Sequence, residues 1–434
     1  MHHLRHLRAG AAIALVGFFA LVGTAAAVAT WSAPADVSPP GENGRGPQIT
    51  LDGRGDAAAV WVSGAFGGGV VELASRRAGE AWNASATALS ASGERAFQPQ
   101  VALDDKGDGI AVWSLFDGSH YIVQAASRTG ADGAWSTPSN LSLPGSDGTS
   151  PQVVLDGRGN AIAIWESNDG TGAIIQSAAK PAGGAWSTPS DLSSRNGVSP
   201  RIGLDGSGNA VAVWQRVDFS AGTVMVESAA KAANGAWSAP TTLGLGASPE
   251  IAIDRSGDAV AVWQQYPTIQ AATRTPDGVW SSPSQISPAG PSTSNPRVGI
   301  DAKGNAIAVW LRSDTSTPGN PRNIVQTASK PFGGAWSAPM DLSPLDDDAI
   351  NPHVAVDKRG EAAVVWGAYN QPTSTSVAQA ATRSSEGRWS APASISPNGT
   401  NLFETDVAMD DKGHAIAVWT SFDSRIQSAD YSFD

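Results

Sequence analysis

A ten-residue pattern recurs eight times along the chain and limits the folds open to it. Each copy begins with an aspartate, has a glycine three residues later and ends in a tryptophan. The copies begin at Asp52, Asp104, Asp156, Asp205, Asp254, Asp301, Asp357 and Asp410. Their closing tryptophans are 47 to 56 residues apart: Trp61, Trp113, Trp165, Trp214, Trp263, Trp310, Trp366 and Trp419. A fixed period of this order indicates a solenoid, a propeller or another repeat architecture.

The third copy shows how one repeat is expected to fold. Residues 151–155 are a short β-rich run and predict a first strand. Asp156 suits the opening of a tight turn, and Gly159 tolerates the positive φ that such a turn requires. Residues 160–165 then alternate with a period of two and predict a second strand. In that strand the alanines and Trp165 share one face, and the isoleucines share the other.

Two further strands complete the repeat. Residues 174–180 predict a third strand, in which one position is Gln or Glu in every copy and is expected to be a repeated hydrogen-bonding group. These residues are Glu72, Gln124, Gln176, Glu227, Gln270, Gln326, Gln379 and Gln427. Residues 185–193 predict a fourth strand, in which a proline indicates a sheet edge. A second tryptophan series, at Trp31, Trp82, Trp135, Trp186, Trp237, Trp280, Trp336 and Trp389, opens this strand.

Four antiparallel strands per repeat describe a propeller blade. The chain begins with a lone fourth-type strand over residues 31–38 and ends after a third-type strand over residues 425–431. Pairing the two would complete the last blade and remove the free edges. We therefore predict an all-β fold, an eight-bladed β-propeller of four-stranded antiparallel blades closed by the N-terminal strand. A β-solenoid is the alternative, and it would leave the terminal strand unpaired.

The first thirty residues differ from the repeats. Arg5 and Arg8 precede an apolar run over residues 11–22, and Ala25-Ala26-Ala27 or Ala27-Val28-Ala29 suits cleavage by signal peptidase. We predict a signal peptide over residues 1–29 and a single propeller domain over residues 30–434. The protein is then expected to be secreted and extracellular, with no membrane span after cleavage.

Composition excludes several classes of function. The formal net charge of −12 argues against nucleic-acid binding, which requires a surplus of Lys and Arg on one face. The chain has no cysteine, no phosphate-binding loop and no nucleophile elbow. The repeated aspartates are expected to cap turns rather than to bind calcium. We predict a monomer with neither cofactor nor metal.

The repeats resemble those of secreted β-propellers of the sialidase and fucose-lectin type. The resemblance is carried by a Trp-Ser-x-Pro strand, an Asp-x-x-Gly hairpin and an alternating strand that ends in Trp, and it covers residues 31–434. It implies a propeller and, through the lectins, carbohydrate binding. Sialidases share an arginine triad, a Tyr–Glu nucleophile pair and an acidic Asp, and no motif in this chain assigns those roles.

Strand polarity separates two faces. The connections between first and second strands, and between third and fourth, are short and uniform, and we call their side the turn face. The other connections vary, and binding residues collect on variable loops over a rigid scaffold. This variable face is therefore expected to bind partners. Its loop aromatics Tyr121, Phe219, Tyr266 and Tyr369 are candidates for stacking on sugar.

One position departs from the uniformity of the repeat. It follows the proline that opens each first strand (Thr405 replaces that proline in the last copy) and is expected to surround the mouth of a central channel. We call these eight residues the inner ring: Gln48, Gln100, Gln152, Arg201, Glu250, Arg297, His353 and Asp406. Three amides precede five titratable groups, so the ring is a candidate for orienting a ligand. The alternative is a set of polar strand ends that face water.

These features favour a non-enzymatic binding module that recognises a glycan or an extracellular protein through the variable face. The first alternative is a glycoside hydrolase or lyase with two carboxylates at the channel mouth, for which Glu250 and Asp406 are the candidates. The second alternative is a structural scaffold at the cell surface.

Overall fold

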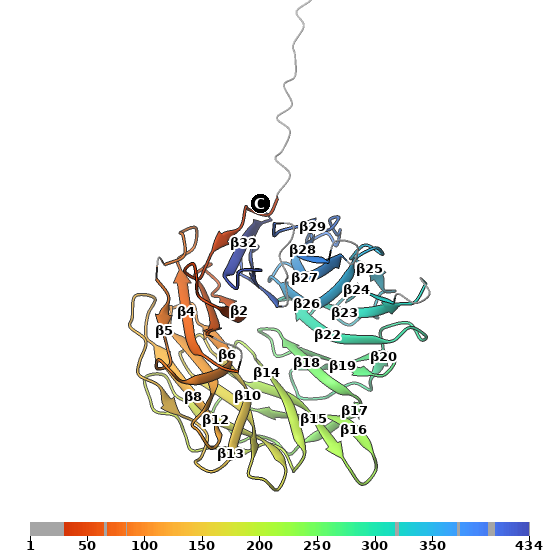
Figure 1. The fold of residues 1–434 in the computed structure, drawn as a ribbon. Helices are drawn as coiled ribbons and strands as arrows, with labels where there is room; N and C mark the ends of the chain where they lie inside the picture. The colour runs from red at the N-terminus through yellow and green to blue at the C-terminus, as the bar shows by residue number, and fades with distance from the viewer. Residues whose placement is uncertain are drawn as a thin grey trace, which may run out of the picture.

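The chain folds into eight blades around a central axis (Figure 1). The computed structural model describes residues 30–64, 67–83, 85–316, 321–370, 374–397 and 404–433. The strands in these ranges form eight four-stranded antiparallel sheets, which confirms the predicted eight-bladed β-propeller. The predicted signal peptide lies outside the described residues. Within those ranges no helix is long and apolar enough to cross a membrane.

Each blade has four strands, which follow one another outward from the axis. The innermost strands are β2 (Gly44–Leu51), β6 (Arg95–Leu103), β10 (Asp147–Leu155), β14 (Gly197–Leu204), β18 (Ala247–Ile253), β22 (Thr293–Ile300), β26 (Asp348–Val356) and β30 (Thr405–Met409). The second strands are β3 (Ala57–Ser63), β7 (Gly109–Phe116), β11 (Ala161–Asn168), β15 (Ala210–Asp218), β19 (Ala259–Gln265), β23 (Ala306–Asp314), β27 (Ala362–Asn370) and β31 (His414–Thr420).

The outer half of each blade is built in the same way. The third strands are β4 (Val70–Arg76), β8 (Tyr121–Arg128), β12 (Ala173–Lys180), β16 (Thr223–Lys231), β20 (Thr268–Arg274), β24 (Arg322–Lys330), β28 (Thr375–Arg383) and β32 (Ile426–Ser432). The fourth strands are β5 (Thr87–Ala88), β9 (Ser139–Asn140), β13 (Ser190–Asp191), β17 (Thr241–Leu245), β21 (Ser284–Gln285), β25 (Met340–Asp341), β29 (Ala393–Ser394) and β1 (Ala35–Asp36).

The fourth strands are shorter than the sequence predicts. In the third blade only Ser190 and Asp191 pair with β12, whereas residues 185–193 were expected to be a strand. Pro189 has no N–H to donate, so the ladder cannot continue through it. Trp186, which lies before this proline, packs instead against the apolar cluster shared by the second and third blades. Beyond the two paired residues, the N–H groups of Ser187 and Leu192 donate to carbonyls of β12, so the outer edge is held by scattered backbone bonds and by side-chain packing.

The two faces of the second strand fill the space between blades, as the alternation predicts. Ala161, Ala163 and Trp165 belong to the cluster shared with the preceding blade. Ile162 and Ile164 belong to the cluster shared with the following blade. Alanine on one face lets neighbouring sheets approach closely, and the buried indole fills the wider gap farther along.

The aspartate of each repeat caps its own turn, as predicted. The buried Asp156 carboxylate accepts hydrogen bonds from the backbone N–H groups of Arg158 at 2.9 Å and of Asn160 at 2.8 Å. Gly159 has a φ of +90°, a conformation that favours glycine. A Cβ added at Gly208 in the next blade would lie 2.9 Å from the Asp156 carboxylate. The turns of adjacent blades are therefore packed against one another.

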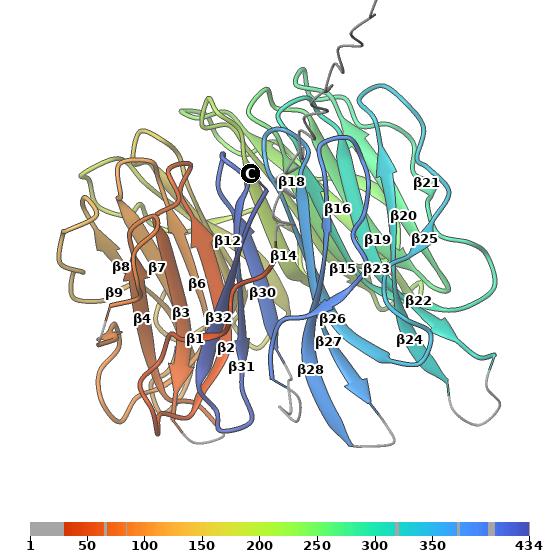
Figure 2. The ribbon, with the colours of Figure 1, turned by 90° about the horizontal axis from the view of Figure 1, so that it is seen from above.

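The ring is closed by the N-terminal strand. β1 pairs antiparallel with β32 and completes the eighth sheet, as Figure 2 shows. Beyond the two paired residues, Val37 N–H donates to the Ile426 carbonyl at 2.8 Å. Ile426 N–H donates in turn to the Ser38 hydroxyl at 2.9 Å. Val37 is only 3% exposed, so the closing segment is packed into the core as well as hydrogen-bonded.

The Gln or Glu of the third strand links three strands of a blade. In the second blade, Trp113 Nε1 donates to Gln124 Oε1 at 3.1 Å, and Gln124 Nε2 donates to Asn140 at 3.0 Å. The sixth blade repeats this chain through Gln326, from Trp310 at 3.1 Å and to Asp341 at 2.7 Å. The predicted role as a repeated hydrogen-bonding group is confirmed in these blades.

The first blade departs from this arrangement. Burial raises the pKa of Glu72 to about 7, and the hydrogen bond and charge of Glu42 add to the rise. One carboxyl oxygen of each of these residues is buried without a hydrogen-bond partner, and so is Nε1 of Trp61. The first blade thus holds two facing carboxyls and an indole N–H that has no partner among the described residues.

Glu72→Gln is expected to stabilise the protein above pH 7. A carboxyl whose pKa is raised on folding contributes fully to stability at pH values below its unfolded pKa. This contribution is lost as the pH rises through the folded pKa, which is about 7 for Glu72. We expect the variant to be about 1 kcal/mol more stable than wild type at pH 8, a figure reduced for partial exposure, and equally stable near pH 4. Urea unfolding at both pH values measures this difference.

Glu227→Gln is the matched control in the fourth blade. Glu227 accepts from Trp214 Nε1 at 3.1 Å and pairs with Arg216 at 2.6 Å, so the same substitution there removes an ion pair. It should lower stability at pH 8. If Glu72→Gln lowered stability in the same way, the two facing carboxyls would not destabilise the first blade.

Candidate functional site

A β-bulge interrupts the inner strand beside each residue of the inner ring in the first seven blades. The Cα register shifts across the proline, for example between Thr149 and Gln152. The residue before the proline has a φ of +46° to +61°; these residues are Gly46, Gln98, Ser150, Ser199, Ser248, Asn295 and Asn351. Proline cannot donate to the ladder, which is why pairing breaks there. The residues on both sides of the proline line a shared cavity in four consecutive blades.

Three charged members of the inner ring pair across the fourth, fifth and sixth blades. Glu250 Oε1 lies 2.9 Å from Arg201 Nε and 2.7 Å from Arg297 Nη1. Burial by itself raises the pKa of Glu250, but the positive charges of Arg201 and Arg297 outweigh burial and lower it overall. This carboxylate is therefore ionised and already paired with two arginines. It is suited to holding neighbouring blades together and not to donating a proton.

The remaining two titratable members link the seventh, eighth and first blades. His353 Nδ1 lies 3.0 Å from Asp406 Oδ1. The second carboxylate oxygen of Asp406 accepts from the backbone N–H of Ile49 at 3.0 Å. The residue Asp406, which we considered as a catalytic carboxylate, is thus engaged on both sides. It contributes to the contact between the last blade and the first.

The three amides of the ring leave more of their bonding capacity free. Gln100 Nε2 donates to Gln48 Oε1 at 3.3 Å. The Nε2 groups of Gln48 and Gln152 donate to the carbonyls of the prolines just before them, at 2.9 Å and 3.0 Å. In the described part of the chain all three bond only to their own strand or to each other, so their remaining donors and acceptors are available to a ligand.

A cavity of about 440 Å³, which we call the amide cavity, opens over this sector. It is lined by Arg45, Gly46, Gln48, Val62, Ala96, Phe97, Gln98, Pro99, Gln100, Ser150, Pro151, Gln152, Ser199, Arg201 and Glu404. Four of the eight predicted ring residues therefore share one cavity. Sequence reasoning missed Phe97 and the polar residues before the prolines, although Gln98, Ser150 and Ser199 occupy equivalent positions in their repeats.

Of the four predicted loop aromatics, one lies near this cavity. The ring of Tyr121 is 5.7 Å from that of Phe97, which lines the cavity, and 5.1 Å from that of Phe116. Phe219 and Tyr266 are 78% and 77% exposed in other blades. Tyr369 lies opposite Asp348 in the seventh blade. The structure therefore does not bring Phe219, Tyr266 or Tyr369 to the amide cavity.

A carboxyl with a shifted pKa lies beside the cavity. Burial raises the pKa of Glu166, and hydrogen bonds from the Ser199 backbone and the Ser150 hydroxyl partly offset the rise. Both serines line the amide cavity. Glu166 directly follows the buried Trp165 of the repeat, and that position varies from blade to blade. In the described part of the chain, no group of three or more His, Asp or Glu residues is placed to hold a metal ion.

No family model and no curated protein matches this sequence. Solved structures resemble its fold. The Dos1 propeller aligns with a TM-score of 0.54 and 8% identity, over 93% of this chain and 95% of that one. A PL25 ulvan lyase, described as a new family of polysaccharide lyase, aligns with a TM-score of 0.51 and 12% identity, over 92% and 95%.

An α-L-arabinofuranosidase from Fusarium graminearum aligns with a TM-score of 0.41 and 12% identity, over 70% of this chain and 98% of that one. Identities this low establish the β-propeller fold alone. The narrower resemblance to sialidases and fucose lectins gains no support from these comparisons.

Glu250→Gln is expected to lower the free energy of unfolding by about 2 kcal/mol at pH 7, because it leaves two partly buried arginines without their shared carboxylate. The pKa of Glu250 is lowered on folding, so its contribution is present above its unfolded pKa and is lost as the pH falls through its folded pKa. The difference between variant and wild type should therefore shrink in acid.

Urea unfolding at pH 7 and pH 3 tests this prediction. Gln152→Ala is the control, since its side chain bonds only to the carbonyl of Pro151, and it should change stability by less than about 0.5 kcal/mol. Equal effects of the two substitutions would contradict a structural role for the charged part of the ring.

Proposed function

We propose that the protein is a lectin-like binding module that recognises a glycan through the amide cavity on its variable face. The observation that carries the proposal is the cavity of about 440 Å³ that brings together three ring amides, Arg201 and the Phe97 ring. Sugars present many hydroxyl groups that amides can both donate to and accept from, and their C–H faces stack on aromatic rings. The cavity volume also lies in the range of small-ligand sites.

The contrast within the ring supports binding over catalysis. Glu250 and Asp406, the carboxylates considered for catalysis, are occupied by Arg201, Arg297 and His353. The open sector is formed by amides, which bind hydroxyl groups without exchanging protons. Secretion belongs to the same proposal, because residues 1–29 have the pattern of a signal peptide and would expose the module to extracellular glycans.

A glycoside hydrolase or lyase is the second candidate, and Glu166 is the observation that favours it. Its raised pKa suits a general acid, and it bonds to two serines that line the cavity. Glu404, which also lines the cavity, supplies a second carboxylate. Its carboxylate accepts from the backbone N–H of Gly46.

The double substitution Gln100→Ala and Gln152→Ala is expected to weaken glycan binding by about 10- to 100-fold, since each amide contributes about 1 kcal/mol or more to a bound polar ligand. A glycan array with the purified protein identifies the ligand, and calorimetry with that ligand measures the loss. Gln285→Ala, on the outer strand of the fifth blade, is the control and should leave affinity unchanged. Binding that survives the double substitution would exclude the amide cavity as the site.

A panel of fluorogenic glycosides and acidic polysaccharides tests the enzyme candidate. We expect binding without turnover. Turnover that Glu166→Gln abolishes would replace the binding proposal with the enzymatic one. If the array and the panel are both negative, a scaffold without a small ligand is the function that remains.

A further inference from the structure

The turn face carries a basic residue in the grooves between blades. The third strand of each of the first seven blades ends in Lys or Arg: Arg76, Arg128, Lys180, Lys231, Arg274, Lys330 and Arg383. Grooves that each contain two of these cations lie between the first and second, fourth and fifth, and sixth and seventh blades. The repeat thus supplies several versions of one groove, which can be compared within the same molecule.

In three of these blades the cation donates to a backbone carbonyl of a nearby turn. Lys231 Nζ donates to the Gly235 carbonyl at 2.6 Å, and Arg383 Nη1 donates to the Gly360 carbonyl at 3.1 Å. Lys330 Nζ lies 3.5 Å from the Pro331 carbonyl. These three cations therefore have backbone carbonyls as hydrogen-bond acceptors. The two grooves that contain them are small, at about 250 and 210 Å³.

The second blade differs by one inserted residue. Seven positions separate Arg128 from Trp135, whereas six separate the basic residue from the tryptophan in the other blades that share this pattern. Among the described residues Arg128 has no hydrogen bond to a turn carbonyl of the kind that Lys231, Lys330 and Arg383 form.

The same blade differs from the others at a second position, which lies against the indole of Trp135. The second strand begins with Gly109, where the first and the third to seventh blades have alanine. A Cβ at this position would lie 3.0 Å from the Trp135 indole, closer than an ordinary contact. The inserted residue and the missing methyl group thus occur together and allow the indole to sit against the strand.

Arg128 is left without a matching acceptor. It lines the groove, and the residue is only 7% exposed. Among the described residues it forms no ion pair, its Nε has no hydrogen-bond partner, and its Nη1 reaches only the Ser75 hydroxyl, at 3.5 Å. Its guanidinium lies 5.3 Å from the Trp135 ring. Burial of a cation without an ion pair lowers the stability of the fold. Such a group is a candidate for binding an anionic ligand.

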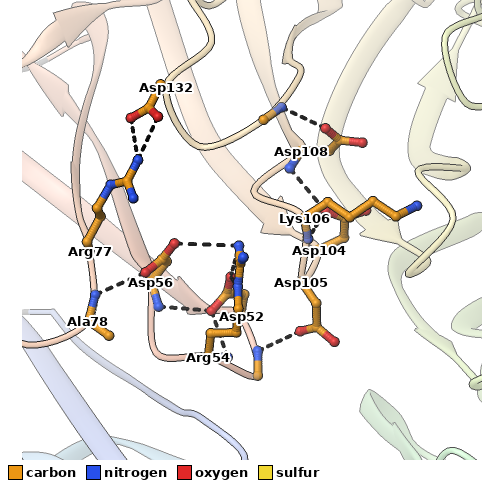
Figure 3. A network of polar contacts seen from close by, with 12 residues as sticks. Asp52, Arg54, Asp56, Arg77, Ala78, Asp104, Asp105, Lys106, Asp108 and Asp132 are labelled. Atoms are coloured by element: carbon orange, nitrogen blue, oxygen red, sulfur yellow. Dashed lines mark hydrogen bonds and ion pairs between the residues drawn. The ribbon is translucent and has the colours of Figure 1, made fainter.

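The other charges of the groove are already matched, as Figure 3 shows for two of them. Arg77 holds Asp132 at 2.6 Å, and Asp56 accepts from the Ala78 N–H at 3.0 Å. Arg76 pairs with Asp430. The exposed Glu80 is the one carboxylate of the groove lining for which no such partner is found in the described ranges. The groove has a volume of about 590 Å³, more than twice that of its counterparts.

We propose that the groove between the first and second blades binds an oxyanion, a carboxylate or sulfate group of a small polar ligand, with Arg128 as its principal donor. The planar guanidinium matches the two oxygens of such a group. Ser75 and Asn83, which also line the groove, can bond to the body of the ligand. This site lies on the turn face and is independent of the amide cavity.

Calorimetric titration of the full-length protein with sodium acetate, sodium sulfate and glucuronate tests the proposal, with glucose as the neutral control. We expect an oxyanion to bind and glucose not to bind. Arg128→Met should weaken oxyanion binding at least about tenfold, while Arg383→Met, in a groove capped by a carbonyl, should not. Tighter binding of glucuronate than of acetate would identify a sugar acid as the source of the oxyanion; equal binding would identify the free ion.

Thermal unfolding without ligand separates this role from a structural one. Arg128→Met should melt at the same temperature as wild type or higher, because it removes a buried unpaired charge. Arg128→Gln and a deletion of Ala131 that shortens the turn are expected to weaken oxyanion binding as well. Absence of binding by all three anions, or equal binding by wild type and Arg128→Met, would overturn the proposal. Neither result would bear on glycan binding at the amide cavity.

Discussion

The pairing of β1 with β32 is the contact on which the remainder of the molecule depends. Seven blades are each formed from one continuous segment, but the eighth takes its outer strand from the other end of the chain. The pair is short, and the packing of Val37 and the hydrogen bonds around Ile426 extend it. The pair covers the outer edge of β32, and the closed ring gives every blade two neighbours against which to bury its alanines and tryptophans.

Because the ring is closed, the eight blades have nearly equivalent surroundings. The candidate binding sites lie where the sequence of one blade differs from that of the others. In the inner ring, titratable side chains pair in two groups, Arg201–Glu250–Arg297 and His353–Asp406, and amides leave one sector open. In the second blade, the turn after Arg128 is one residue longer, the second strand begins with Gly109, and the Arg128 guanidinium has no ion pair among the described residues. The two departures lie on opposite faces. A rigid scaffold can accept such local changes because the buried cores between blades are unaffected.

Much of the fold was predictable because it depends on local patterns. The aspartate turns, the alternation of Ala161 to Trp165 and the complementary chain ends each follow from periodicity or turn chemistry. Identification of the inner ring also needed only the repeat register. The pairing of Glu250 with Arg201 and Arg297 was not predictable, since it depends on how far side chains reach between blades that are about 50 residues apart. Phe97 was missed for the same reason, because only the bulge brings it to the amide cavity.

Hydrogen–deuterium exchange with and without a bound glycan tests most directly whether ligand binding follows the open sector of the ring. The account predicts slower exchange in peptides that cover the bulges of the second, third and fourth blades, including the Ser150 N–H that donates to Gln98 at 2.9 Å. The ring residues outside the amide cavity, Glu250, Arg297, His353 and Asp406, should show little change. Protection confined to the exposed loops that contain Phe219 and Tyr266, with no change at these bulges, would contradict the account.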